Sequence, residues 1–281
     1  MNYNISSEEF QDPLLKPILQ KLTAYFSEQD ISFYVIGATA RDIIMNIHGE
    51  MSDRATRDLD LAIAISNWES YSEVEKGIVK IEGFKKDTEQ KQRFLYLDVF
   101  PVDIVPFGEI RKKSDKIFWP PDESVALTVL GFEEVQKSTD KVVIDDSLSI
   151  EVASLDGIFI LKLISWVDRN LDNNKDADDL AFIINNYLNI NEKRVIEEHY
   201  DEIYLSENFN SNIAGAKLLG IDIAKILSDN QETRHAIINI LETEISKAEE
   251  SKLINQVLET HKGFKYQETT ACFQSVLSGL K

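Results

Sequence analysis

The chain of 281 residues has little of several features that commonly point to a function. It has one cysteine, Cys272, so no internal disulfide bond can form, and we expect the protein to work in the cytosol. Its apolar runs are short, because the run at residues 157–161 ends at Lys162, well before the roughly 20 residues that a membrane helix needs. We therefore expect neither a disulfide-stabilised secreted protein nor a membrane protein.

Positive charge is also scarce. Lysine and arginine total 30 against 49 acidic residues, which leaves a net charge of −19. Non-specific DNA binding depends on a broad basic surface, so this composition excludes it. Short basic runs at residues 85–91 and 111–113 leave room for local binding of a structured RNA such as tRNA.

Several catalytic signatures are missing as well. The four histidines are scattered without the spacing of zinc ligands. The sequence has no Gly-x-Ser-x-Gly motif, no Walker-type phosphate loop and no paired cysteines. Zinc, serine-hydrolase, P-loop and thiol-redox chemistry therefore have no support.

The chain has 43% hydrophobic residues, which is enough to form a large core. These residues are arranged differently in the two halves of the sequence. In the first half, extended segments alternate with helical ones, and residues 108–124 are charged and proline-bearing, as in an exposed excursion. Strands are expected at residues 31–36, 58–65, 93–97, 100–107, 127–132, 142–144 and 148–152, with helices at 9–28, 38–48 and 67–81. Helical periodicity then continues at 157–169, 176–187, 193–199, 213–227, 232–248 and 253–261. We predict an α/β (α+β) domain at residues 1–153 and a helical domain at 154–281.

A glycine turn joins the first of these strands to a helix. The strand ends at Gly37, and a helix begins at once, so free backbone N–H groups face outward where phosphate oxygens bind favourably. A glycine required only by a tight turn would look the same. Arg41, in the first helical turn, suits either a triphosphate or a neighbouring carboxylate.

A pair of acids follows about twenty residues later. Asp58 and Asp60 are two positions apart on a strand, so both carboxylates point to the same face. Their flanks are apolar, and unpaired carboxylates on a buried strand would cost several kcal/mol. Either a divalent metal ion lies between them or they pair with Arg54 or Arg57.

A third acid, Asp103, lies between valine and isoleucine on a later strand, in the same apolar-acid-apolar pattern. Asp98 competes for this role, but it lies nearer a turn. Three carboxylates beside a phosphate-binding helix predict a two-metal site for in-line attack at phosphorus, with two Mg²⁺ ions, or Mn²⁺, as cofactors and an NTP as substrate.

These motifs resemble those of the DNA polymerase β-like nucleotidyltransferase superfamily, in which a glycine turn precedes acids with hydrophobic flanks. Residues 37–42 are similar to the turn of tRNA nucleotidyltransferases. The downstream segments, residues 152–169 and 175–180, are similar to predicted bacterial nucleotidyltransferases and to the abortive-infection (type IV) toxin nucleotidyltransferases. The resemblance implies a polymerase β-like domain with a mixed sheet, followed by a helical domain.

The resemblance also implies roles for particular residues. Asp58, Asp60 and Asp103 become the catalytic and metal-binding acids. The nucleotide would be bound by the turn and by three residues of the helical half, namely Gly37, Ala38, Thr39, Arg41, Lys162, Lys175 and Asp176. From the sequence alone, Lys162 could equally extend to solvent, and Asp176 could equally complement a helix dipole.

We therefore predict a nucleotidyltransferase that moves an NMP from an NTP to an acceptor hydroxyl on an RNA or tRNA end, a protein or a small molecule, and releases pyrophosphate. A toxin–antitoxin role and a partner protein bound through the helical domain go with it. The alternative is a non-catalytic nucleotide-binding or regulatory protein with the same fold. Ala38 favours this alternative, because many relatives have a phosphate-binding serine there.

Overall fold

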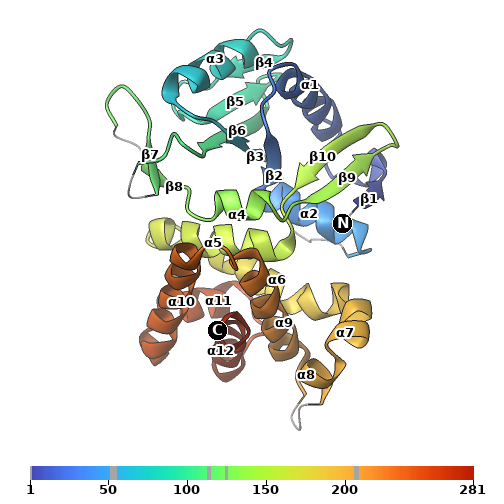
Figure 1. Ribbon diagram of the computed structural model, residues 1–281, viewed down its shortest axis with the longest axis vertical. Coiled ribbons are helices and arrows are strands. Elements are labelled where there is room, and N and C mark those ends of the chain that lie inside the picture. The colour runs from blue at the N-terminus through green and yellow to red at the C-terminus, as the bar shows by residue number, and fades with distance from the viewer. Residues whose placement is uncertain (1, 51–55, 113–114, 124–125, 206–208) are drawn as a thin grey trace. The chain divides into compact units, whose positions relative to one another are not determined.

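The computed structural model describes residues 2–50, 56–112, 115–123, 126–205 and 209–281. The chain divides into two compact units, Met1–Ser154 and Leu155–Lys281. The first unit contains the strands and the second is helical (Figure 1). This is the mixed α/β fold class predicted above; the assignment of a separate function to each domain stays a prediction.

The first unit is built on an eight-stranded mixed sheet in the order β1-β9-β10-β2-β3-β6-β5-β4. β3 is parallel to β6 and antiparallel to β2, so the centre of the sheet contains both directions. The strands of this sheet are β1 (Asn2–Ile5), β2 (Phe33–Ile36), β3 (Leu59–Ala64), β4 (Phe84–Lys86), β5 (Arg93–Tyr96), β6 (Phe100–Phe107), β9 (Asp140–Ile144) and β10 (Leu148–Val152).

Short helices and a separate hairpin complete this unit. α2 packs against β2 and β3, and α3 packs against β4. Apolar residues at helical spacing along α1 are buried, as their periodicity predicts. These further elements are η1 (Ser7–Glu9), α1 (Leu15–Glu28), α2 (Gly37–Ile47), α3 (Trp68–Ile78), the hairpin β7 (Lys116–Phe118) with β8 (Ala126–Thr128), and α4 (Phe132–Gln136).

The first unit differs from the sequence prediction in several places. Residues 108–124 were expected to be an exposed excursion, yet β7 lies within them and has Ile117 fully buried. The strand expected at 127–132 ends at Thr128, because Gly131 adopts a left-handed conformation (φ 85°) and α4 begins at Phe132. The edge strands β1 and β4 carry too few residues for a clear period-two pattern. Part of the loop expected at 49–57 lies outside the described residues.

The second unit consists of helices around a buried apolar core. α9 contacts α6 and α12, and α5 contacts α6. Its elements are α5 (Leu155–Arg169), α6 (Lys175–Ile190), α7 (Glu192–Glu198), α8 (Tyr200–Tyr204), α9 (Ser211–Ile226), α10 (Gln231–Ser246), η2 (Ala248–Glu250), α11 (Lys252–Thr260) and α12 (Tyr266–Leu280). α8 and α12 had not been predicted as separate helices. No helix in the described part of the chain is long and apolar enough to cross a bilayer.

Candidate active site

The centre of the sheet brings two of the predicted acids together. Asp60 of β3 and Asp103 of β6 are direct partners in the register of these parallel strands. Paired residues on neighbouring strands point to the same face and have backbones only about 5 Å apart. Asp58 lies two residues before Asp60, directly ahead of β3. The fold therefore brings Asp103, far away in the sequence, beside Asp58 and Asp60 at the start of β3.

Gly37 lies directly against this acid group. Ile36, the last residue of β2, is the antiparallel register partner of Asp60, so the turn into α2 begins beside that acid. Gly37 has φ 70°, and a Cβ atom added to it would lie 2.2 Å from Oδ2 of Asp60. Any side chain here would be strained and would also displace the carboxylate. The glycine of the motif is therefore required by Asp60 as well as by the turn.

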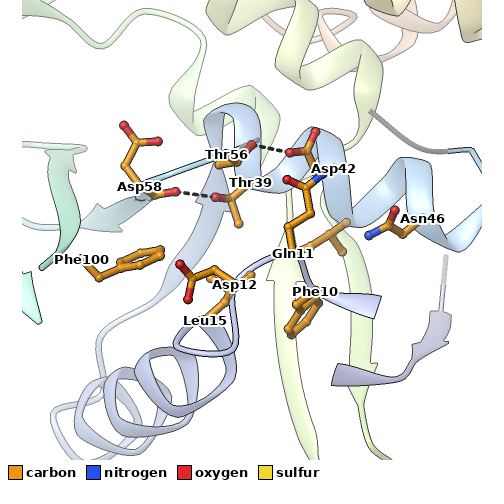
Figure 2. Close-up of a pocket in the computed structure, with 11 residues that line it drawn as sticks. Phe10, Gln11, Asp12, Leu15, Thr39, Asp42, Asn46, Thr56, Asp58 and Phe100 are labelled. Atoms are coloured by element: carbon orange, nitrogen blue, oxygen red, sulfur yellow. Dashed lines mark hydrogen bonds between the residues drawn. The ribbon is translucent and has the colours of Figure 1, made fainter. Parts of the chain in front are cut away.

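The other side chains of the turn are engaged within the fold. Thr39 is buried, and its hydroxyl donates a hydrogen bond of 2.7 Å to the main-chain carbonyl of Asp58 (Figure 2). This bond ties the start of α2 to the start of β3. Arg41 is 2% exposed, and its guanidinium donates to Oδ1 of Asp42 from Nε at 2.9 Å and from Nη2 at 2.7 Å.

Asp42 is in turn bonded to the segment that leads to the acids. Its second oxygen accepts a hydrogen bond from the hydroxyl of Thr56 (Figure 2). The Arg41 and Asp42 side chains therefore form a buried polar support that is bonded to Thr56, two residues before Asp58. The bond to Thr56 and the bond from Thr39 together fix the chain on either side of Arg57.

A small cavity lies beside this support. It has a volume of about 30 Å³ and is lined by side chains that include Leu15, Thr39, Asp42, Asp58 and Phe100. Such a volume holds roughly one water molecule and cannot hold a nucleotide. Figure 2 shows the Asp58 carboxylate pointing away from the Thr39 hydroxyl and from the apolar lining. The Asp58 carboxylate is therefore not directed at the apolar part of this cavity.

Asp103 already has a cationic partner. Nε of Arg93 donates to its Oδ1 at 2.7 Å and Nη2 donates to its Oδ2 at 2.8 Å, which makes a bidentate ion pair across β5 and β6. Gln92 approaches Oδ2 at 3.5 Å. Hydrogen bonding to Asp103 raises the pKa of Arg93, and the charges of Asp58 and Asp60 raise it further. The negative charges of all three predicted acids therefore stabilise the charged form of Arg93.

Asp98 lies in the β5–β6 turn at φ 61°, where it is exposed and pairs with Lys85 at 2.8 Å. Asp103, rather than Asp98, lies beside Asp60. Arg57 is exposed, and Arg54 lies outside the described residues.

The three site residues predicted in the helical half separate into two groups. Nζ of Lys162 lies 2.6 Å from Oδ2 of Asp179 and 3.4 Å from Oδ1 of Asp176. Arg169 adds bonds of 2.8 and 3.0 Å to Asp176. Both aspartates are almost fully buried, whereas Lys175 is exposed at the start of α6. Lys162 and Asp176 therefore belong to one buried charge cluster, and Lys175 lies outside it.

Sequence reasoning gave no site role to Arg93, Arg169 or Asp179, and a signal existed for Arg93 and Asp179. Arg93 and Asp103 are equally distant from residue 98, so a hairpin turn there places them opposite each other. Asp179 follows Asp176 by three residues, which puts both on one face of a helix.

The short basic runs do not form a free cationic surface in the part of the chain that the structure describes. Lys85 pairs with Asp98, Lys86 with Glu75 and Lys91 with Asp122. In the second run, Lys112 pairs with Glu123, and Arg111 pairs with two acids. Lys113 lies outside the described residues.

The acids suit a hard divalent cation in kind and partly in placement. Carboxylate oxygens are the ligands that Mg²⁺ and Mn²⁺ prefer, and the strand register brings Asp60 and Asp103 side by side with Asp58 next to them. Within the described residues, however, no three His, Cys, Asp or Glu side chains converge as a metal-binding group. Asp58 and Asp60 therefore offer ligand atoms of the right chemistry, and Asp103 offers them once it is released from Arg93.

Two solved structures match most of the chain at low sequence identity. The antibiotic-resistance factor ANT(2'')-Ia, in its solution structure, is 15% identical, with 83% of this chain and 99% of that chain covered and a TM-score of 0.38. CdnE cyclic dinucleotide synthase of Elizabethkingia meningoseptica, with GTP and Apcpp, is 11% identical, with 99% and 93% covered and a TM-score of 0.28. At such TM-scores neither likeness carries an argument, and no curated protein matches the sequence.

The family model gives a direct assignment. Residues 20–262 match the model of the AbiEii nucleotidyl transferase toxin, type IV toxin–antitoxin system. The match spans most of both units and confirms the resemblance to abortive-infection nucleotidyltransferase toxins. The chain therefore belongs to the AbiEii nucleotidyltransferase toxin family.

Proposed function

We propose that the protein transfers an NMP from an NTP to an acceptor hydroxyl beside the start of β3, where Asp60 pairs with Asp103 of β6. The observation that carries this proposal is the register of Asp60 and Asp103 on adjacent parallel strands, with Gly37 against Asp60. In the reaction, the acceptor oxygen attacks the α-phosphorus of the NTP. The bond between the α-phosphorus and the α–β bridging oxygen breaks, and pyrophosphate leaves. The hydroxyl proton passes to a base.

Each part of the site has a proposed task. Asp58, Asp60 and Asp103 would hold the divalent cations, Mg²⁺ or Mn²⁺. When bound, these ions supply charge neutralisation at the triphosphate and lower the pKa of the attacking hydroxyl. Asp103, once free of Arg93, orients the acceptor hydroxyl.

The triphosphate is assigned to the start of α2. The helix begins at Gly37, and Ile36 provides no side-chain cap, so the first-turn N–H groups are available for phosphate oxygens. Because Thr39 and Arg41 are engaged within the fold, backbone groups at Gly37 and Ala38 take the larger share of this contact. The missing serine hydroxyl at Ala38 is then a smaller loss than the sequence alone suggests.

The proposed roles of Lys162, Lys175 and Asp176 depend on the family resemblance. Lys162 is already neutralised by Asp179 and Asp176, so a phosphate contact requires it to exchange a partner. Lys175 is exposed and can contact a phosphate without such an exchange.

The proposed acceptors are an RNA end such as that of tRNA, a protein or a small molecule. A cognate antitoxin is the proposed partner, which the family assignment to toxin–antitoxin systems supports. The paired basic runs disfavour binding of RNA through a continuous cationic surface. A hydroxyl bound by shape or by few contacts is compatible with the acidic chain.

The test is a labelling assay in host lysate with each of the four α-labelled NTPs, read on RNA gels, on protein gels and by thin-layer chromatography. We expect the wild-type protein to label one acceptor class and Asp58→Asn to label none. Labelling by both proteins would remove the Asp58 carboxylate from the mechanism.

A second candidate function is favoured by one observation. The bidentate Arg93–Asp103 pair neutralises the third acid, as expected of a nucleotide-binding protein that has lost turnover. Saturable NTP binding with no pyrophosphate release in the presence of lysate acceptors would favour this candidate.

A further inference from the structure

The acid group contains one cation that the catalytic scheme does not use. Arg93 projects from β5, and its strand partner is Asp103, whose own partner on the other side is Asp60. The three residues therefore form one row across β5, β6 and β3. A guanidinium at the end of this row lies where the acids concentrate negative potential.

The contact is specific. Both Arg93–Asp103 bonds, at 2.7 and 2.8 Å, are short and roughly parallel, the arrangement in which arginine binds a carboxylate most strongly. The Arg93 side chain is 23% exposed and that of Asp103 is 12% exposed, so water screens the pair only partly. Both carboxylate oxygens are used, which are the atoms that a metal ion at Asp103 would need.

Resting on the function proposed above, we propose that Arg93 is an internal counter-ion that competes with the divalent cation for Asp103. Without metal, the guanidinium neutralises Asp103 and stabilises the acid row. Metal binding at Asp103 requires this ion pair to open. Arg93 is thus a positioning residue that lowers the affinity of the site for free divalent cations, so that occupancy depends on a second source of binding energy such as the triphosphate.

The direction of this effect follows from electrostatics. A positive charge next to the ligands repels an incoming cation, and breaking a bidentate pair adds a further cost. Removal of Arg93 therefore strengthens metal binding while it weakens the metal-free protein. A residue with a purely structural role would weaken both.

The experiment measures Mn²⁺ binding to the full chain without nucleotide, by counting free Mn²⁺ with electron paramagnetic resonance, and records thermal melting of the same samples. The variant is Arg93→Gln, which removes the charge but keeps a polar side chain. The matched control is Lys85→Gln on the neighbouring strand β4, an exposed cation that pairs with Asp98. A third sample, Asp60→Asn, tells site-bound Mn²⁺ from ions bound elsewhere.

We expect Arg93→Gln to bind Mn²⁺ at least about tenfold more tightly than wild type, a change of roughly 1.4 kcal/mol. Its melting temperature should be lower than that of wild type without Mn²⁺ and should rise more on Mn²⁺ addition. Lys85→Gln should match wild type in both measurements.

Three results would overturn the inference, and they also separate it from the proposed function. Equal Mn²⁺ affinity in wild type and Arg93→Gln, with weaker binding in Asp60→Asn, would reject the role of Arg93 and leave the proposed site standing. An equal gain in Lys85→Gln would show a general charge effect. No Mn²⁺ binding that depends on Asp60 in any sample would reject the metal site itself and the inference with it.

Discussion

Two charge clusters, one in each unit, use the same residue types to different effect. In the helical unit, Lys162 and Arg169 face Asp176 and Asp179, so two cations balance two nearly buried acids. In the sheet unit, Arg93 contacts Asp103, and the charges of Asp58 and Asp60 also act on Arg93. A balanced cluster is typical of structural support, whereas acids gathered on neighbouring strands attract a divalent cation.

Neutralising one acid of the sheet unit tests the difference between the two clusters most directly. Asp60→Asn should lower nucleotidyl transfer by at least about a thousandfold, because metal contributes several kcal/mol of charge stabilisation and each 1.36 kcal/mol is a factor of ten. The melting temperature should not fall, since repulsion among the acids is relieved. Pyrophosphate release and thermal melting of the same sample measure both. A large loss of stability would make Asp60 a structural residue.

In the helical unit, loss of a charge should act on stability instead. Lys162→Met leaves Asp179 and Asp176 buried with one cation fewer, and breaking a buried pair costs about 3 kcal/mol or more. Urea denaturation measures the loss. Lys175→Met is the matched control, because this exposed lysine should change the free energy of unfolding by less than about 0.5 kcal/mol. Equal effects of the two variants would contradict the balanced cluster.

A comparison of Gly37 with Gly49 tests whether Asp60 needs a glycine beside it. Gly37 and Gly49 have similar positive φ values, 70° and 75°, but an added Cβ meets Asp60 at 2.2 Å only at Gly37 and nothing within 4 Å at Gly49. Gly49→Ala should cost about 1 kcal/mol from backbone strain. Gly37→Ala should cost more and should also reduce pyrophosphate release, since it displaces the carboxylate. Similar activities in the two variants would separate Gly37 from the site.

The smallest expected effect is on the reactivity of the single cysteine, which reports on the packing of the helical unit. Cys272 is fully buried, and burial raises the pKa of its thiol to about 12, so little thiolate exists at pH 8. Native wild type and Asp60→Asn should react slowly with a thiol reagent, and Lys162→Met faster. Rapid reaction of native wild type would mean that this part of the helical core is open.

Sequence patterns predicted the elements that carry the site, because strands β2, β3 and β6 and helix α2 are strongly apolar or periodic. Asp60 and Gly37 were identified from local spacing alone. The pairing of Asp103 with Asp60 required the strand order, which local patterns do not contain. Arg93 was missed because its partner lies across a hairpin, and Asp179 because its role depends on Lys162 from another helix.

The central claim is that Asp103 joins Asp58 and Asp60 in one nucleotidyl-transfer site, and the pair Asp103→Asn and Asp98→Asn tests it most directly. Both remove one carboxylate close to the same hairpin, one beside Asp60 and one in the exposed turn. Label transfer from α-labelled NTPs should be lost in Asp103→Asn and unchanged in Asp98→Asn. Full transfer by Asp103→Asn, or its loss in Asp98→Asn alone, would contradict the account.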